Sequence, residues 1–344
     1  MFLTIVIPMR NEEAYVGRCM DSILPQIQGR DDVEVLLVDG RSTDRTREIA
    51  AEYAARDGRI RVLDNPKCIV PTGMNLAIRE ARGDAIMRLD CHAEYADDYV
   101  DACLRVLERT GAEAVGGYME TRPGTDTPAG RAIAAATSSV FGVGGSRFRV
   151  GGEDEREVDA LPFSCYRRDV FERLGVFDER LVRNQDIEMS TRIRQHGGRI
   201  IISPGIRLTY YTRSTYAGLR QQAFYNGLWN VYTLYLVGGG IRPRHLVPML
   251  FMMSIPILGA LGFLWWGFWA ILGAELAVYL AASLVMAARA ARNKSTSLAL
   301  VMLAFWQLHM AYGMGSLCGL VTAPVKWRHR TEGQADEVPP ERRD

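Results

Sequence analysis

Short apolar runs alternate with longer amphipathic stretches through the first third of the chain. The apolar runs are rich in β-branched and aliphatic residues, as buried strands are, and the stretches between them carry apolar residues at helical spacing. Strands that alternate with helices in this way build parallel sheets with crossover connections, so the pattern predicts a doubly wound α/β domain. The expected strands are 3–7, 33–38, 60–63, 85–89 and 114–117, and the expected helices are 12–26, 43–56, 71–82 and 97–109.

Residues 121–158 break this alternation. They are rich in glycine, proline and charge, which predicts a flexible, partly ordered loop region. Their glycines do not form Gly-x-Gly-x-x-Gly between a strand and a helix, so dinucleotide binding is a weak hypothesis there. Regular structure is expected again at 161–166 and in a helix over 186–196, which Gly197 and Gly198 close.

The last third of the chain is apolar enough to enter a membrane. Residues 247–288 contain one ionisable side chain, Glu275, over a length that fits two spans of about 20 residues, and the tryptophan-rich stretch 262–269 is the expected join. A third apolar segment covers 298–325. The alternative is that these segments are core helices of a soluble bundle. The expected organisation is 1–230 globular, 231–245 a juxtamembrane linker or interfacial helix, 246–325 a membrane region with about three hydrophobic segments, and 326–344 a disordered charged tail.

Basic residues flank the first two segments. Because such residues favour the cytoplasmic side, both ends of this hairpin and the globular domain are expected to face the cytoplasm, in a multi-pass protein of the cell's inner membrane. Three simple spans would place the basic tail on the opposite side, so the side of the tail stays open. The flanking residues are Arg242 and Arg244 before the hairpin, and Arg289, Arg292 and Lys294 after it.

Charge and cysteine content narrow the possible partners. The 344-residue chain has a formal net charge of +1, which leaves no overall field to attract nucleic acid, so nucleic acid is not an expected partner. The six cysteines contain no Cys-x-x-Cys pair, which argues against structural zinc and a disulfide framework. Reduced, packed thiols are expected.

Acidic residues follow two of the predicted strands, where the ligands of such sheets bind. Asp39 can accept hydrogen bonds from a base or a ribose hydroxyl. Asp90 and His92 lie two residues apart and can reach one cation, which would neutralise a diphosphate. Imidazole in place of a second carboxylate shifts the preference from Mg²⁺ toward Mn²⁺. Glu12 is either a first-turn helix acid or part of a nucleoside pocket.

Asp186 stands at the start of a predicted helix. It can act as a general base if it reaches an acceptor hydroxyl, or it can simply stabilise the helix N-terminus. The residues by themselves leave both roles open. Glu188 lies four residues before Arg192, so an ion pair along the helix is expected.

Several of these motifs together resemble inverting family 2 glycosyltransferases with the GT-A fold, over about residues 3 to 230. Further stretches resemble the membrane-associated enzymes of exopolysaccharide assembly, including the succinoglycan type. The first set comprises 6–13, the Val-Asp-x-x-Ser-Thr-Asp stretch 38–44, 73–75, 81–84, Asp90 and Asn184-Gln185-Asp186. The second set comprises Phe141-Gly142-Val143-Gly144, Arg147-Phe148-Arg149 and Val158-Asp159.

The resemblance implies a nucleotide-sugar donor, a divalent metal and a lipid-linked acceptor. It favours Asp186 as the catalytic base, and Asp90 as a metal ligand, beside which the spacing of the residues places His92. The chain departs from the family twice: the usual Asp-x-Asp is Asp90-Cys91-His92, and the usual Glu-Asp pair is Gln185-Asp186. The implied nucleotide-sugar contacts are Pro8, Asn11, Glu12, Asp39, Asn75 and Asp90, and the candidate phosphate or acceptor contacts are Arg147, Arg149, Gln185, Arg213 and Gln222.

The sequence therefore predicts a GT-A domain followed by C-terminal transmembrane helices. We expect it to transfer one sugar, with inversion, from a UDP-sugar to a polyprenyl-diphosphate-linked glycan, using Mn²⁺ or Mg²⁺. Two alternatives are a processive polysaccharide synthase, which would give products of many lengths, and a non-catalytic nucleotide-binding scaffold in a membrane assembly.

Overall fold

The computed structural model describes residues 1–239, 243–294 and 296–327. Within these residues, nine strands form one sheet, in the order β3-β2-β1-β4-β8-β6-β9-β5, with β7 also paired to β9. The strands are β1 (Leu3–Met9), β2 (Val33–Asp39), β3 (Ile60–Asp64), β4 (Ala85–Arg88), β5 (Ala93–Tyr95), β6 (Ala114–Pro123), β7 (Arg156–Glu157), β8 (Cys165–Arg167) and β9 (Ile200–Thr212).

The predicted α/β fold is confirmed, and its sheet is mixed, because antiparallel strands join the predicted parallel ones. The first four strands are parallel, as predicted, with residues 3–9 of β1 opposite residues 33–39 of β2. The three-residue strand β8 enters antiparallel between β4 and β6. The strands β5 and β7 are also antiparallel, to β9. These three strands have two or three residues each, too few for an alternating pattern to be read from the sequence.

Four helices follow the first strands where the sequence placed them, although α1 begins four residues late. The helix predicted at 186–196 is confirmed as α9, and its Glu188–Arg192 ion pair is present at 2.6 Å. The helices are α1 (Val16–Ile27), α2 (Thr46–Arg56), α3 (Val70–Glu80), α4 (Tyr99–Thr110), α5 (Pro128–Thr137), α6 (Val140–Val143), α7 (Arg147–Val150), α8 (Arg168–Leu174), α9 (Gln185–Gln195), α10 (Tyr216–Val237), α11 (Val247–Leu261), α12 (Gly267–Lys294) and α13 (Leu298–Trp327), with a 3₁₀ turn at Pro243–His245.

The loop predicted at 121–158 is largely ordered, and that prediction was wrong. It contains the end of β6, the three helices α5 to α7, and β7. The helix α5 is apolar and packs against α12 and α13, so its stability comes from partners far along the chain. Glycine and proline content alone is therefore not enough to predict a loop in this segment.

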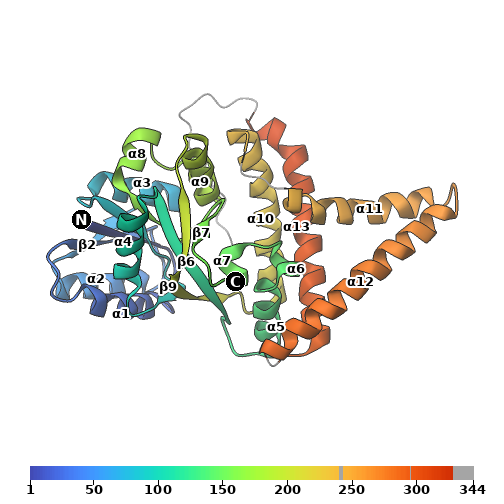
Figure 1. Cartoon of the computed structure of the whole chain (residues 1–344), viewed down its shortest axis with the longest axis horizontal. Coiled ribbons are helices and arrows are strands. Elements are labelled where there is room, and N and C mark those ends of the chain that lie inside the picture. The colour runs from blue at the N-terminus through green and yellow to red at the C-terminus, as the bar shows by residue number, and fades with distance from the viewer. Residues whose placement is uncertain (240–242, 295, 328–344) are drawn as a thin grey trace.

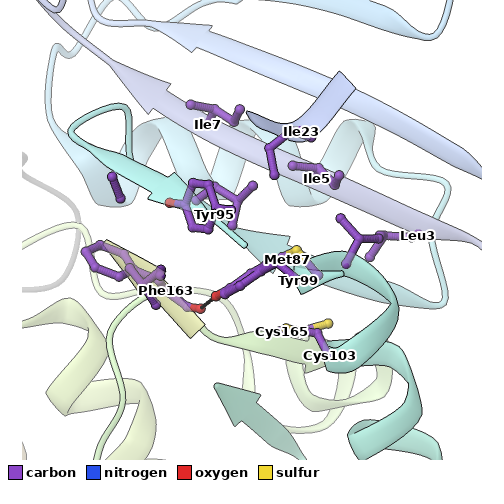
Figure 2. Packing of buried hydrophobic residues seen from close by; sticks show 14 of the residues in the cluster. Leu3, Ile5, Ile7, Ile23, Met87, Tyr95, Tyr99, Cys103, Phe163 and Cys165 are labelled. Carbon is purple, nitrogen blue, oxygen red and sulfur yellow. Dashed lines mark hydrogen bonds between the residues drawn. The ribbon is translucent and has the colours of Figure 1, made fainter. Parts of the chain in front are cut away.

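The core of the α/β domain joins the sheet to α1 and α4. Figure 2 shows Ile5 and Ile7 of β1 facing Tyr95 and Tyr99 across this core. The hydroxyl of Tyr99 donates a hydrogen bond of 3.2 Å to the backbone oxygen of Phe163, drawn as a dashed line. Phe163 has a left-handed backbone (φ 53°), and this buried bond holds it in place. The core thus fixes a residue at the rim of the site described below.

All six cysteines are free thiols, as expected, and four of them are buried. Burial raises the pKa of the Cys91 and Cys165 thiols. Neutral thiols are poor nucleophiles, which fits a packing role.

The apolar C-terminal segments form three helices beside the α/β domain (Figure 1). The helices α10 and α13 lie side by side, and α11 and α12 project from them as a hairpin. By length and composition, residues 267–292 and 298–326 are two candidate membrane spans, while α11 is a shorter apolar helix. The expected boundary at residue 230 falls inside α10. Of the expected linker, 240–242 lie outside the described residues, as do 328–344 of the expected tail.

Candidate active site

A cavity of about 1080 Å³ lies where the α/β domain meets the apolar helices. Small-molecule sites usually measure roughly 300–1,000 Å³, so this cavity is at the large end for a ligand site. One part of its wall is polar and the other is mostly apolar. The polar part contains Arg88, Asp90, His92, Arg149, Asn184, Asp186 and Gln222, and the apolar part includes Leu219, Leu250, Phe251, Val278 and Leu308.

The end of β4 brings a buried arginine to the cavity. Arg88 donates from Nε to Asp90 Oδ1 at 3.1 Å and from Nη2 to Asp90 Oδ2 at 3.3 Å. Its guanidinium lies over the ring of Phe163, 5.9 Å from the ring centroid. Burial opposes its charge, but Asp90 and Asp186 raise the pKa of Arg88 above its ordinary value. Nη1 has no hydrogen-bond partner among the residues that the structure describes. A buried cation of this kind suits an anionic ligand.

His92 lies between two carboxylates. Its Nε2 is 4.0 Å from Asp90 Oδ2 and its Nδ1 is 3.9 Å from Glu12 Oε1. The edge of its ring meets Tyr210 of β9, with 5.3 Å between centroids. Tyr210 also contacts Arg149 of α7, whose guanidinium is 4.7 Å from the ring centroid. The His92 imidazole and the Arg149 guanidinium therefore share one wall of the cavity.

These donors fit a divalent cation that a substrate helps to hold. Asp90 and His92 supply one carboxylate and one imidazole within reach of a common ion, a mixed set less specific to Mg²⁺ than a pair of carboxylates. No group of three or more His, Cys, Asp or Glu that could hold a metal is found in the described part of the chain. Phosphate oxygens would have to complete the coordination, as they do in many phosphate-binding metal sites.

Asp186 faces the same cavity from the first turn of α9. Its Oδ1 accepts a hydrogen bond of 3.0 Å from the backbone amide of Ile187. Burial raises the pKa of Asp186 above its ordinary value, and the nearby Arg88 opposes that rise. A carboxylate with a raised pKa accepts a proton more readily, as a general base must. The strand-end pair at 90 and 92 and the candidate base thus open onto one space, which a single displacement requires.

A second group of predicted residues lies at the ends of β1 and β2. Asp39 is fully buried and accepts a 2.6 Å hydrogen bond from the Ser42 hydroxyl. Asn11 has a left-handed backbone (φ 54°), and its side-chain oxygen accepts from the Thr43 amide at 2.8 Å. Asp44 accepts from the Thr46 amide at 3.0 Å, which stabilises the start of α2. The bond between Asn11 and Thr43 ties the two strand-end loops together, and the other two order the loop after β2.

The remaining candidates divide between the cavity and other places. Arg149 and Gln222 line the cavity, whereas its described lining does not include Pro8, Asn11, Glu12, Asp39, Asn75, Arg147, Gln185 or Arg213. The side-chain nitrogen of Asn75 donates to the backbone oxygen of Phe177 at 2.8 Å, and its side-chain oxygen accepts from the Phe177 amide at 2.9 Å. These two bonds tie α3 to a later turn. Gln185 is buried beside Asp186, and its Oε1 lacks a hydrogen-bond partner among the described residues.

Sequence reasoning missed Arg88. A charged residue inside the apolar run 85–89 was the available signal, because a buried arginine is rarely left without an anion. It also missed Tyr210. It did not predict that the helices α6, α11, α12 and α13 form part of the cavity wall. No local pattern could have given these, because they are distant in sequence.

A sequence model of the family described as Glycosyl transferase family 2 matches residues 4–175. The chain belongs to this family. The matched region contains the strand ends that carry Asp39, Asp90 and His92, but it stops before Asp186. The GT-A-type mixed α/β domain and the membership inferred from the motifs are both confirmed.

Curated relatives agree with the assignment. The succinoglycan biosynthesis protein ExoA of Rhizobium meliloti is 34% identical over 222 residues, which cover 64% of this chain and 66% of that protein. A Methanococcus voltae enzyme named as a dolichyl N-acetyl-glucosaminyl phosphate glucuronosyltransferase is 26% identical, over 62% of this chain and 68% of its own. The match thus spans about two thirds of each relative.

Solved structures share the fold. The mannosyltransferase PcManGT from Pyrobaculum calidifontis aligns with a TM-score of 0.57 at 22% identity, covering 95% of this chain and 88% of its own. Residues 1–349 of S. aureus TarS align with a TM-score of 0.51 at 16% identity, covering 99% and 98%. The first alignment extends over nearly the whole chain, beyond the residues that the family model matches.

Proposed function

We propose that this glycosyltransferase moves a single sugar, with inversion, from a UDP-sugar to a lipid-linked glycan at the membrane. The observation that carries the proposal is the shared cavity: Asp90, His92 and Asp186 open onto it, and it continues between apolar helices. A soluble nucleotide sugar could enter from the polar side, and a lipid-linked acceptor from the apolar side.

In the proposed reaction, Asp186 takes the proton from the acceptor hydroxyl. The freed oxygen attacks the anomeric carbon and forms the new glycosidic bond on the face opposite the diphosphate. The bond between the anomeric carbon and the diphosphate oxygen breaks, and the nucleoside diphosphate leaves with that electron pair. This single displacement needs positioning but no covalent intermediate.

The leaving diphosphate collects negative charge, which nearby cations stabilise. Arg149 lies on the cavity wall over the ring of Tyr210, which also contacts His92, so it is placed to bind a phosphate oxygen. A divalent ion held by Asp90 and His92 would supply further positive charge at the diphosphate. Two solved structures with this fold support a nucleotide-sugar donor, because one holds GDP-Man with Mn²⁺ and the other holds UDP-GlcNAc.

The acceptor and the location rest on the C-terminal helices. Two candidate membrane spans and a succinoglycan-type relative support a membrane-associated protein. The other relative is named for a dolichyl-phosphate-linked substrate. We therefore place the α/β domain on the cytoplasmic face of the inner membrane, with a polyprenyl-diphosphate glycan as acceptor.

The test is to incubate the purified full-length protein with a panel of UDP- and GDP-sugars and lipid-linked acceptors, with and without Mn²⁺, and to weigh the products. One new species, heavier by one sugar, is expected. A ladder of products would indicate a processive synthase. The absence of both transfer and donor hydrolysis across the panel would favour a non-catalytic scaffold.

The base is tested by Asp186→Asn. This substitution keeps the shape of the side chain but removes its ability to take a proton, so we expect transfer to fall by at least about 10²-fold, while UDP binding measured by calorimetry persists. Asp169→Asn on α8 is the matched control, because that carboxylate lies outside the cavity lining and forms an exposed ion pair with Arg173. Normal turnover by Asp186→Asn would refute the assignment.

A further inference from the structure

We infer that Tyr312, on the apolar helix α13, is a positioning residue for the turn that carries Asp186, and that it acts through Asn230 and Asn184. This inference concerns a hydrogen-bonded chain across three segments that are distant in sequence. Its chemical consequence rests on the proposed role of Asp186, but the chain itself can be tested without substrate.

The chain begins at the residue just before α9. Asn184 has a left-handed backbone (φ 63°) and sits at the N-cap position, yet its side chain makes no capping bond. Its amide instead donates to Asn230 Oδ1 on α10 at 2.8 Å. The amide of Asn230 donates in turn to the hydroxyl of Tyr312 on α13. All three side chains line the cavity.

The far end of the chain is held firmly, because α10 and α13 approach each other closely. A Cβ added to Gly227 of α10 would lie 2.1 Å from the backbone oxygen of Tyr312, and one added to Gly315 of α13 would lie 1.9 Å from that of Phe224. Only glycine permits backbones this close. Asn230 itself is 7% exposed, so its bonds are shielded from competing water.

The near end of the chain is joined directly to the helix that carries the base. The backbone oxygen of Asn184 accepts a hydrogen bond of 3.0 Å from the Glu188 amide, which closes the first turn of α9 around Asp186. The side chain of Asn184 therefore fixes this turn against the helix pair α10 and α13. Catalytic geometry is sensitive to shifts of about 1 Å, so loosening this tether would slow the chemistry without weakening donor binding.

The chain offers a closely matched control. Tyr232 of α10 also bonds across to α13, where its hydroxyl is 2.8 Å from Thr322 Oγ1. Tyr232→Phe removes one hydroxyl between the same two helices, but this bond does not lead to Asn184. A purely structural effect of losing such a bond would appear in both tyrosine variants.

The experiment is hydrogen–deuterium exchange on full-length protein in lipid nanodiscs, read by mass spectrometry on peptides that cover 184–193. Tyr312→Phe and Asn184→Ala are expected to speed exchange of the amides in the first turn of α9 by about three- to tenfold. Tyr232→Phe is expected to leave them unchanged. Equal exchange in Tyr312→Phe and Tyr232→Phe would overturn the inference.

Kinetics then separate this inference from the proposed function. With the donor and acceptor that the panel identifies, Tyr312→Phe is expected to lower kcat roughly tenfold with donor KM unchanged. Adding Asn184→Ala to Tyr312→Phe should cause no further loss of kcat, because both substitutions break the same hydrogen-bonded chain. If the loss of kcat in the double variant equalled the product of the two single losses, the inference would be overturned. Faster exchange in Tyr312→Phe together with normal transfer by Asp186→Asn would support the inferred hydrogen-bonded chain. It would refute only the role of Asp186 as the base.

Discussion

At the scale of single residues, the cavity depends on one buried guanidinium between two carboxylates. Arg88 is bonded through two nitrogens to Asp90 and also feels the charge of Asp186. Each carboxylate offsets part of the penalty for burying Arg88, and Arg88 does the same for them. Arg88 therefore stabilises both carboxylates and is stabilised by them, although the two carboxylates repel each other.

Replacing Arg88 should accordingly destabilise the fold. Arg88→Met leaves the Asp90 carboxylate enclosed without its partner, and breaking a buried pair costs about 3–5 kcal/mol. The expected result is a clear fall in the midpoint of thermal unfolding of the detergent-solubilised protein. Arg105→Met, which removes an exposed ion pair with Asp98, is the control and should change little. Equal midpoints for the two variants would contradict the buried-pair explanation.

The buried Asp186 predicts a pH dependence with a definite sign. Its folded pKa lies above the ordinary value of 3.8, so the folded state takes up this proton first as pH falls. Stability from this group is therefore complete below pH 3.8 and is lost as pH rises through the folded pKa. Relative to Asp186→Asn, the wild-type protein should gain thermal stability on acidification from neutral pH towards 4. A constant difference between the two unfolding midpoints would show that the pKa is not raised.

At the scale of elements, the sequence predicted those whose pattern is long and local. The strands β1, β2 and β4 and the helix α9 are where their periodicity placed them, within a residue or two. Helices α5 to α7 were missed because the segment is punctuated by glycine, and α5 gains its order from packing against α12 and α13. A pattern read over a dozen residues has no access to such partners.

The close contact of α10 and α13 gives a prediction at this scale. Gly315→Ala would place a methyl group 1.9 Å from the Phe224 backbone oxygen, so the helices must separate and the thermal midpoint should fall by several degrees. Gly273→Ala is the control: it lies on α12 with no atom within 4 Å of the added Cβ among the described residues. Alanine is the better helix former, so the control should be neutral or slightly stabilising. A Gly315→Ala variant as stable as the control would contradict the packing described here.

At the scale of the whole molecule, the hairpin of α11 and α12 stands away from the α/β domain (Figure 1). Its tip exposes large apolar side chains, including Phe263 and Leu264 at 82% each. In water such a tip would be unfavourable, and a bilayer would cover it. The 15 residues of α11 measure roughly 22 Å, less than the hydrocarbon thickness of about 30 Å.

Trp265 and Trp266 at this tip should therefore report their depth in a membrane. In reconstituted vesicles, lipids brominated near the headgroup should quench tryptophan fluorescence more than lipids brominated near the chain end, because tryptophan favours the interface. The double variant Trp265→Phe/Trp266→Phe should lose most of this difference. Stronger quenching from the chain ends would place the tip in the hydrocarbon core and argue against an interfacial join.

The sequence by itself determined the family, the order of the first strands and helices, and the apolar nature of the C-terminal third. These depend on local periodicity and on motifs such as residues 6–13 and the Val-Asp-x-x-Ser-Thr-Asp stretch 38–44. Only the tertiary structure decided which candidates share a space. It brought His92 and Asp186, 94 positions apart in the chain, onto one cavity, and it left Asn75 and Arg213 outside the described lining. It also revealed Arg88 and the chain from Asn184 to Tyr312. The physical reason is that such sites arise from packing between distant segments, which no local pattern encodes.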